Sequence, residues 1–139
     1  MYHTDLDPIP NEPNAFYVGW LDSSHEYKLG YTHDNFRRRL WVFCNRRGFQ
    51  SKGFHACDLC EEVVYAREEE LEGKRIQLGS AEIRVFGNND KIYAAPDLIY
   101  HYITKHNYCP PEEFIGAVIS GPLPGSNAYE ELFKRNQYW

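Results

Sequence analysis

The sequence predicts a single α+β domain, with a small antiparallel sheet and three to four helices. Its 139 residues match one ordinary domain that builds its own hydrophobic core. Segments in which apolar and polar residues alternate are interspersed with segments of helical periodicity. Two cysteines and two histidines also follow the order C-x2-C…H-x4-H, a spacing typical of metal ligands. No linker of domain size interrupts the chain, so residues 1–139 are expected to fold together.

The N-terminal half is predicted to contain an arm, a strand and a helix. Three prolines in residues 1–14 exclude a helix or a central strand there, and this segment is expected to lie as an arm on the domain surface. Residues 15–21 have the composition of a strand. A helix is predicted over residues 33–45, because Thr32 is a good N-cap and apolar side chains recur there at helical spacing.

The C-terminal half alternates short strands and helices. Strands are predicted at 63–66, 75–78, 81–85 and 91–94, with 68–74 as a charged connection and 87–90 as a hairpin loop. A helix is expected to begin at Pro96, because proline suits the first helical turn. A further helix follows Pro110-Pro111, and a last short one spans 127–134 with Ser126 as its cap.

A metal site is the main chemical prediction. The knuckle around Cys57 and Cys60 offers two sulfurs, and the helix that follows Pro96 carries His101 and His106. Zinc accepts a tetrahedron of two thiolates and two imidazoles, so Zn²⁺ is the expected ion. Residues 53–120 then form a zinc-binding knuckle, hairpin and helices. Positions five apart on a regular helix differ by about 140°, so both histidines reach one ion only if the last turn loosens.

Other ligand sets remain open at the level of sequence. Cys109 lies three residues after His106 and forms a second close pair with it, and His55 is able to replace either helix histidine. In the absence of a metal, Cys57 and Cys60 would be small buried apolar residues. Four protein ligands close a zinc site, whereas three leave a position for an activated water.

Several motifs resemble those of a family of small uncharacterised bacterial proteins. They are GFHxCxxC at 53–60, LGSAEIRV at 78–85, YAAPDLIYHY at 93–102 and PPEEF at 110–114, and the Gly-Trp-Leu at 19–21 is similar too. The resemblance implies that the C-x2-C pair and both helix histidines are metal ligands. It implies no activity.

Composition narrows the class of partner. The formal net charge of −5 and pI near 5.6 disfavour generic binding to nucleic acid or anionic membranes. No apolar run has the length of a membrane span, and the first residues lack the pattern of a signal peptide. A cytoplasmic location is therefore expected, and its reducing conditions favour thiols or metal ligands over disulfides for the four cysteines.

Nucleic-acid binding is an alternative because the charges are segregated. Residues 35–57 carry six basic side chains and no acid, interleaved with aromatic residues that stack on bases. Residues 58–72 carry seven acids and a single base. We therefore expect the basic helix to pair with the acidic segment inside the fold, or with an acidic patch on a partner.

The function that these observations favour is a non-catalytic, zinc-stabilised protein-binding module, such as an immunity-type or regulatory adaptor protein that occludes a partner. The chain lacks the zinc-deaminase, metalloprotease, phosphate-loop and nucleophile-elbow motifs. A zinc hydrolase or a thiol redox enzyme remains an alternative. The expected contact surface combines aromatic and acidic residues, namely Trp20, Trp41, Tyr65, Glu68, Glu69, Glu70 and Glu72.

Overall fold

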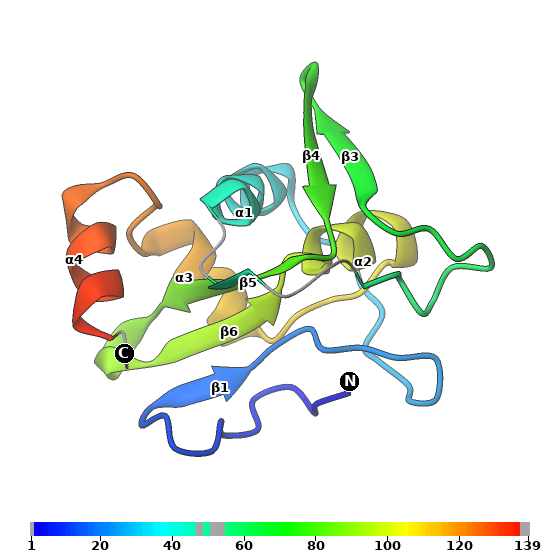
Figure 1. Cartoon of the computed structure of the whole chain (residues 1–139). Helices are drawn as coiled ribbons and strands as arrows, with labels where there is room; N and C mark the ends of the chain where they lie inside the picture. The colour runs from blue at the N-terminus through cyan, green and yellow to red at the C-terminus, as the bar shows by residue number, and fades with distance from the viewer. Residues whose placement is uncertain (1, 47–48, 51–54, 137–139) are drawn as a thin grey trace.

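The computed structural model describes residues 2–46, 49–50 and 55–136 (Figure 1). In chain order the elements are β1 (Ala15–Tyr17), α1 (Asp34–Arg46), β2 (Phe49–Gln50), β3 (Arg67–Leu71), β4 (Lys74–Leu78), β5 (Ala81–Phe86), the 3₁₀ turn η1 (Asn88–Asp90), β6 (Ile92–Pro96), α2 (Ile99–His106), α3 (Glu112–Ser120) and α4 (Asn127–Arg135). The predicted α+β class is confirmed. None of the described helices is both long enough and apolar enough to cross a membrane.

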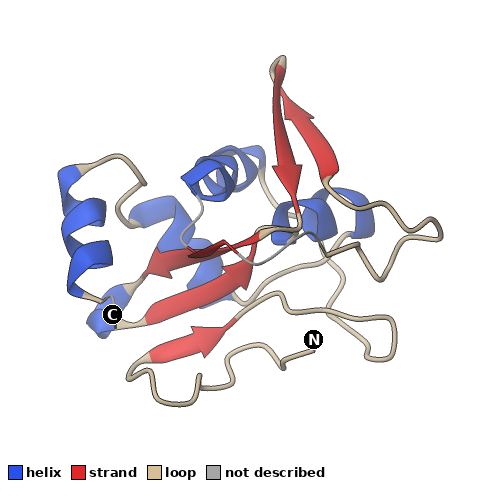
Figure 2. Ribbon diagram, in the orientation of Figure 1, coloured by secondary structure: helices blue, strands red, loops and turns tan. Residues whose placement is uncertain are grey.

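The strands form two separate sheets (Figure 2). The main sheet has the order β1-β6-β5-β2, and β5 pairs antiparallel with both β6 and β2. β1 pairs parallel with β6, which the prediction of an antiparallel sheet did not include. A parallel pair requires a long crossover connection, and here the chain between β1 and β6 supplies it. β3 and β4 form the second sheet, an antiparallel hairpin that stands away from the first.

The core lies between the main sheet and a layer of helices. Ile83 and Val85 alternate along β5 and are fully buried. Tyr93 of β6 points to the same face and meets Phe114 of α3 edge to face at 6.0 Å, and Phe114 in turn meets Phe36 of α1 at 6.3 Å. Figure 1 shows α1 and α3 on one side of the sheet. The amphipathic helix predicted over 33–45 is therefore α1, with its apolar stripe on the sheet.

Residues 2–14, most of the segment that we expected to be an N-terminal arm, lie along β1. Leu6 N donates to Tyr17 O at 2.7 Å and Ile9 N donates to Ala15 O at 2.9 Å. Asp5 is an anchor, because one carboxylate oxygen accepts from Gly19 N at 2.9 Å and the other from the Tyr108 hydroxyl at 2.7 Å. The arm is thus a fixed part of the domain.

Three local predictions are wrong. Residues 63–66 form no strand, and the charged connection 68–74 is the β3–β4 hairpin. Glu72 and Gly73 both have positive φ, 52° and 81°, and this pair suits a two-residue hairpin turn. Pro96 is the last residue of β6, and α2 begins only at Ile99. Ser126 is confirmed as the cap of α4, since its side chain accepts from Tyr129 N.

Candidate metal centre

The cysteine knuckle is held in place by the turn between β4 and β5. His55 N donates to Gly79 O at 2.6 Å, and Gly79 N donates to the buried carboxylate of Asp97 at 2.8 Å. Gly79 has φ 105°, and a Cβ there would lie 2.4 Å from His55 O, so only glycine fits. The contacts connect the knuckle, the β4–β5 turn and the segment that leads into α2.

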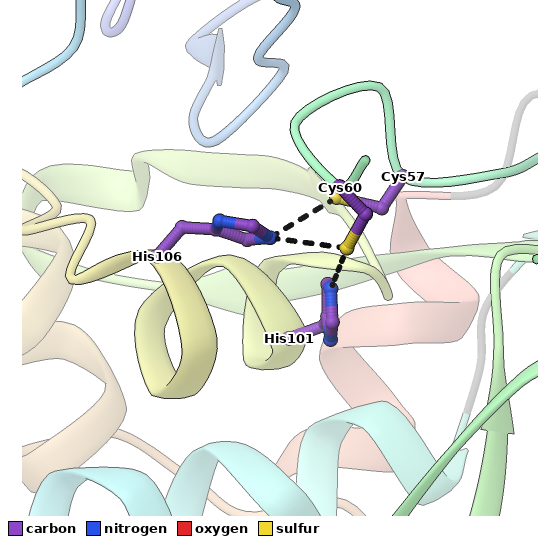
Figure 3. Close-up of side chains that lie close together, drawn as sticks. All are labelled: Cys57, Cys60, His101 and His106. Atoms are coloured by element: carbon purple, nitrogen blue, oxygen red, sulfur yellow. Dashed lines mark hydrogen bonds between the residues drawn. The ribbon is translucent and has the colours of Figure 1, made fainter. Parts of the chain in front are cut away.

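Four ligand atoms meet above α2 (Figure 3). Cys60 Sγ lies 3.2 Å from His101 Nε2 and 3.3 Å from His106 Nε2, and Cys57 Sγ lies 3.5 Å from His106 Nε2. One ligand atom from each of the four residues falls within 4.8 Å of every other. Zinc bond lengths in a tetrahedron place S and N ligands about 3.6 Å apart. The four side chains therefore fit a single ion of this kind.

The irregular C-terminal end of α2 explains how His101 and His106, five residues apart, reach the same side of the helix. His106 is the last helical residue, and Asn107 follows in the left-handed conformation, φ 55° and ψ 28°. The N–H of Asn107 bonds to Tyr102 O, five residues back, and Tyr108 N donates to the same oxygen at 3.2 Å. Such a closure is wider than an α-turn and rotates fewer degrees per residue. The predicted loosening is thus present, and it turns His106 towards the side of His101.

Strand β3 adds a second layer around these ligands. Glu69 Oε2 lies 3.0 Å from His101 Nδ1, and both side chains are buried. Arg67 Nη2 lies 3.4 Å from Cys60 Sγ. Metal-bound histidines commonly donate their other ring N–H to a carboxylate, which fixes the tautomer and the ring orientation. Arg67 and Glu69 are two residues apart on a strand and so share the face that looks at the site.

Burial shifts the pKa of Cys57 and of His106. Loss of solvent and the neighbouring Cys60 raise the pKa of Cys57 to about 11. Burial, with His101 and Arg67 close by, lowers the pKa of His106, so this imidazole is neutral at pH 7. A neutral imidazole is ready to ligate, whereas a buried thiol gives up its proton when a cation takes its place. A raised thiol pKa is the opposite of what a redox C-x-x-C centre needs.

The rival ligands lie outside this cluster. The Cys109 thiol has Pro110 O as its near neighbour, at 3.7 Å, and its Cβ and Sγ lie close to Gly30. His55 is exposed and contributes only its backbone to the knuckle. Gly53 and Phe54, the first residues of the predicted 53–120 unit, lie outside the described residues. The structure therefore brings together the four ligands predicted from the sequence.

The predicted partner-binding residues separate into exposed and buried groups. Tyr65 is 64% exposed, and Glu68, Glu70 and Glu72 are exposed along the hairpin. Two residues are corrections. Trp41 is 5% exposed because it packs edge to face on Tyr100, and Glu69 is 8% exposed because it faces His101, so neither is available for a contact surface. Trp20 is half-buried and donates from its indole N–H to Ala94 O.

The basic segment is largely occupied by contacts within the chain. Arg37 is ion-paired with Asp34, and Arg38 with Glu72 at the tip of the hairpin. Arg39 donates to the carbonyls of Val118 and Gly121 at the end of α3, and Arg46 pairs with Glu130 of α4. Arg47 and Lys52 lie outside the described residues. The Arg38–Glu72 pair is the expected contact between the basic helix and the acidic segment.

A cavity of about 630 Å³ lies at the opposite end of the sheet, between the β5–β6 turn and α3. At its wall the Tyr93 hydroxyl donates to Glu113 Oε2 at 2.5 Å, and Lys91 Nζ pairs with the same oxygen at 3.2 Å. The two donors, the Tyr93 bond first, lower the pKa of Glu113. These polar groups are engaged with one another, so the cavity does not match a ready catalytic pair.

The chain belongs to the family described as "Domain of unknown function (DUF7919)", whose model matches residues 1–119. The matched region contains the four clustered side chains Cys57, Cys60, His101 and His106, together with the β3–β4 hairpin. It ends one residue before the end of α3. No curated protein and no solved structure matched the chain. The comparisons agree with the expectation of an uncharacterised family.

Sequence reasoning found the ligands but missed their supporting layer. Glu69 lies in the stretch 68–74 that we predicted to be a connection, and Arg67 lies between that stretch and the predicted strand 63–66, so neither side chain was assigned to a face. The signal was present in the alternation of Ile76 and Leu78 on the other side of the Glu72-Gly73 turn. With residues 67–71 assigned as the partner strand, Arg67 and Glu69 pair opposite Leu78 and Ile76 and so lie on the inner face of the hairpin.

Proposed function

We propose that this protein is a non-catalytic binding module stabilised by a structural zinc ion. The observation that carries the proposal is the convergence of Cys57, Cys60, His101 and His106, whose ligand atoms lie within 4.8 Å of one another. Two sulfurs and two imidazole nitrogens form a donor set that zinc favours over hard cations such as magnesium or calcium.

A structural role follows from the number of ligands. Four protein side chains fill a tetrahedral zinc ion and leave no position for an activated water. Glu69, the carboxylate beside the cluster, is engaged with His101 Nδ1 and so supports a ligand instead of acting as a general base. The ion would cross-link the knuckle to α2, and its binding free energy would add to the stability of that region.

The surface that we propose for binding is the acidic face, defined as Tyr65, Glu68, Glu70 and Glu72. An exposed tyrosine beside several carboxylates suits a protein partner that presents basic residues. Val63, 70% exposed, adds an apolar contact next to it. Trp41 and Glu69 are no longer part of this surface, because both are buried.

Metal content is the first test. Elemental analysis of the purified chain is expected to give one zinc per molecule that resists mild chelation. Cys57→Ser and His101→Ala should each lose it, since three ligands hold zinc far more weakly than four. A wild-type chain that takes up no zinc from solution would disprove the zinc proposal.

The binding surface has its own test. A Glu68→Lys/Glu70→Lys double variant should keep its zinc and its fold, because both side chains are exposed. When the chains are cross-linked to their neighbours in cells, a partner protein captured by the wild type should be absent from the double variant. Lys74→Glu, a charge change at the other side of the hairpin tip, is the matched control. Equal capture by all three chains would show that the acidic face is not the contact surface.

A further inference from the structure

The β3–β4 hairpin needs an anchor outside itself. It is a two-stranded sheet that pairs with no strand of the main sheet among the described residues, and it stands away from the body of the domain (Figure 2). A single two-stranded hairpin is at best marginally stable in water. Its fixed position must therefore come from side-chain contacts with the rest of the chain.

Two of those contacts are made directly to the proposed zinc ligands. Glu69 faces His101 Nδ1 at 3.0 Å, and Arg67 faces Cys60 Sγ at 3.4 Å. If an ion binds Nε2 of His101, the ring proton must sit on Nδ1, so His101 donates and Glu69 accepts. The Nε atom of Arg67 is also buried and has no hydrogen-bond partner among the described residues.

The remaining contacts lie further from the ion. Ile76 and Leu78 of β4 are buried, and Arg38 pairs with Glu72 at the exposed tip. An exposed ion pair contributes little to stability, typically under about 1 kcal/mol. Arg67 and Glu69 are therefore the polar contacts that determine how β3 sits on α2.

We propose that Arg67 and Glu69 couple the metal centre to the β3–β4 hairpin, so that the bound ion holds the hairpin against α2 and loss of the ion releases it. The ion fixes the ring of His101 and the sulfur of Cys60, and each is the partner of one of these side chains. Glu68 and Glu70 alternate with Arg67 and Glu69 on the same strand, so seating of the inner pair fixes the direction in which the outer carboxylates point. This coupling rests on the proposed zinc site and makes the acidic face dependent on the metal.

The coupling is reciprocal by thermodynamic necessity. If zinc favours the seated hairpin, a protein that binds the seated acidic face must tighten zinc by the same factor. The partner that fits is a basic protein surface that recognises the hairpin only in the metal-loaded chain.

Hydrogen exchange of the full chain, loaded with zinc or stripped by chelation, tests the release of the hairpin. Amides of residues 67–78 are expected to exchange faster after zinc is removed, while those of β5 and β6 keep their protection. Equal protection of the hairpin in the two states would overturn the proposal.

A matched pair of variants tests the positioning role of Glu69. Glu69→Gln is expected to weaken zinc binding about tenfold to a hundredfold, measured by competition with a chromophoric chelator. It should also change the visible spectrum of the Co²⁺-substituted protein, because the orientation of His101 changes. Glu70→Gln, the adjacent residue on the outer face, should match the wild type in both measurements.

The outcomes separate the two proposals. If the wild type binds one zinc and Glu69→Gln behaves as Glu70→Gln does, the coupling is wrong and the zinc site stands. If the wild type binds no zinc, both are wrong. Arg67→Gln gives an independent reading, with faster exchange of the hairpin expected even in the zinc-loaded chain.

Discussion

Cys60 makes the largest number of contacts within the proposed metal centre. Its sulfur lies between the two imidazoles, 3.2 Å from His101 and 3.3 Å from His106, and it also contacts Arg67. Cys57 contacts His106 at 3.5 Å and lies beside Cys60. Loss of the Cys60 sulfur would therefore disturb both histidines and the hairpin together.

Cys60→Ser is expected to abolish stoichiometric zinc binding and to lower the melting temperature, because serine is a poor zinc ligand. Cys109→Ser is the matched control, since Cys109 is another partly exposed cysteine and lies outside the cluster. Elemental analysis and thermal unfolding give the two readouts. Zinc loss in Cys109→Ser with retention in Cys60→Ser would favour the rival ligand set.

Glu113, at the other end of the sheet, makes a pH-dependent contribution to the stability of the fold. Its pKa is lowered by the bonds from Tyr93 and Lys91. A carboxyl whose pKa falls on folding stabilises the fold fully above its unfolded pKa, and that contribution disappears as the pH drops through the folded pKa.

Tyr93→Phe should therefore destabilise the protein most at neutral pH, and the difference from the wild type should shrink in acid. We expect a loss of about 1 kcal/mol or less, since Glu113 is partly exposed. Tyr129→Phe is the control, because its hydroxyl donates to the backbone oxygen of Arg84, which does not titrate. Urea unfolding at several pH values measures both. If Tyr93→Phe lowered the free energy of unfolding equally at every pH, the bond from Tyr93 would not be what lowers the pKa of Glu113.

At the scale of elements, the end of α2 makes the ligand spacing work. H-x4-H is unfavourable on a regular helix, and the wide closure at Asn107 permits it. The sequence predicted that the last turn must loosen, and the helix ends at Asn107, where asparagine tolerates the left-handed conformation. It did not predict the bond that reaches back to Tyr102, which depends on where Tyr108 is buried.

Asn107→Ala is expected to cost about 1 kcal/mol in stability, because alanine resists positive φ. It should also weaken zinc binding, since the last turn would tighten and carry His106 away. Asn107→Gly accepts the same φ and should keep the wild-type affinity. Chelator competition and thermal unfolding of the two variants check this. An alanine variant with unchanged zinc affinity would show that the wide turn is not needed.

Strand β3 of the hairpin is the element that the sequence pattern did not predict. Helical periodicity identified α1 and alternation identified β5, and the predicted hairpin loop at 87–90 placed the returning strand that is β6. β3 reads Arg-Glu-Glu-Glu-Leu, and its inner face lies against the polar side chains of His101 and Cys60 instead of apolar ones. Polarity alone therefore suggested a solvated connection. The alternation reappears only when His101 and Cys60 are known to lie opposite.

At the scale of the whole molecule, the apolar core and the proposed metal centre would stabilise different parts of the fold. Most of the core lies between the main sheet and helices α1 and α3, and at one end it includes Cys57, one of the four proposed ligands. The length of the chain predicts a core of this kind, because a domain of this size needs no metal to fold. The 1–139 single-domain prediction stays a prediction, since neither the family match to residues 1–119 nor the fold tests it.

Removal of zinc is therefore expected to lower the melting temperature while the far-ultraviolet circular dichroism remains near native. The helices and β5–β6 keep their packing, and only the knuckle and hairpin loosen. A zinc finger, in contrast, unfolds completely without its metal. Circular dichroism before and after chelation, with zinc restored as the control, gives the measurement. Complete loss of helical signal would mean that the ion is required for the whole fold.

The proline-containing arm along β1 has a consequence for assembly. β1 uses one edge to pair with β6, and the arm occupies the other through bonds such as Tyr17 N to Asp7 O at 2.9 Å. An uncovered strand edge is a template for a strand of another molecule, and proline is a poor continuation of a sheet. The arm thus covers the outer edge of β1 with a segment that is itself unsuited to pairing with a further strand, because it contains Pro8, Pro10 and Pro13. A chain without its first thirteen residues would expose the outer edge of β1. Pairing of that edge with another copy of the chain would then compete with folding.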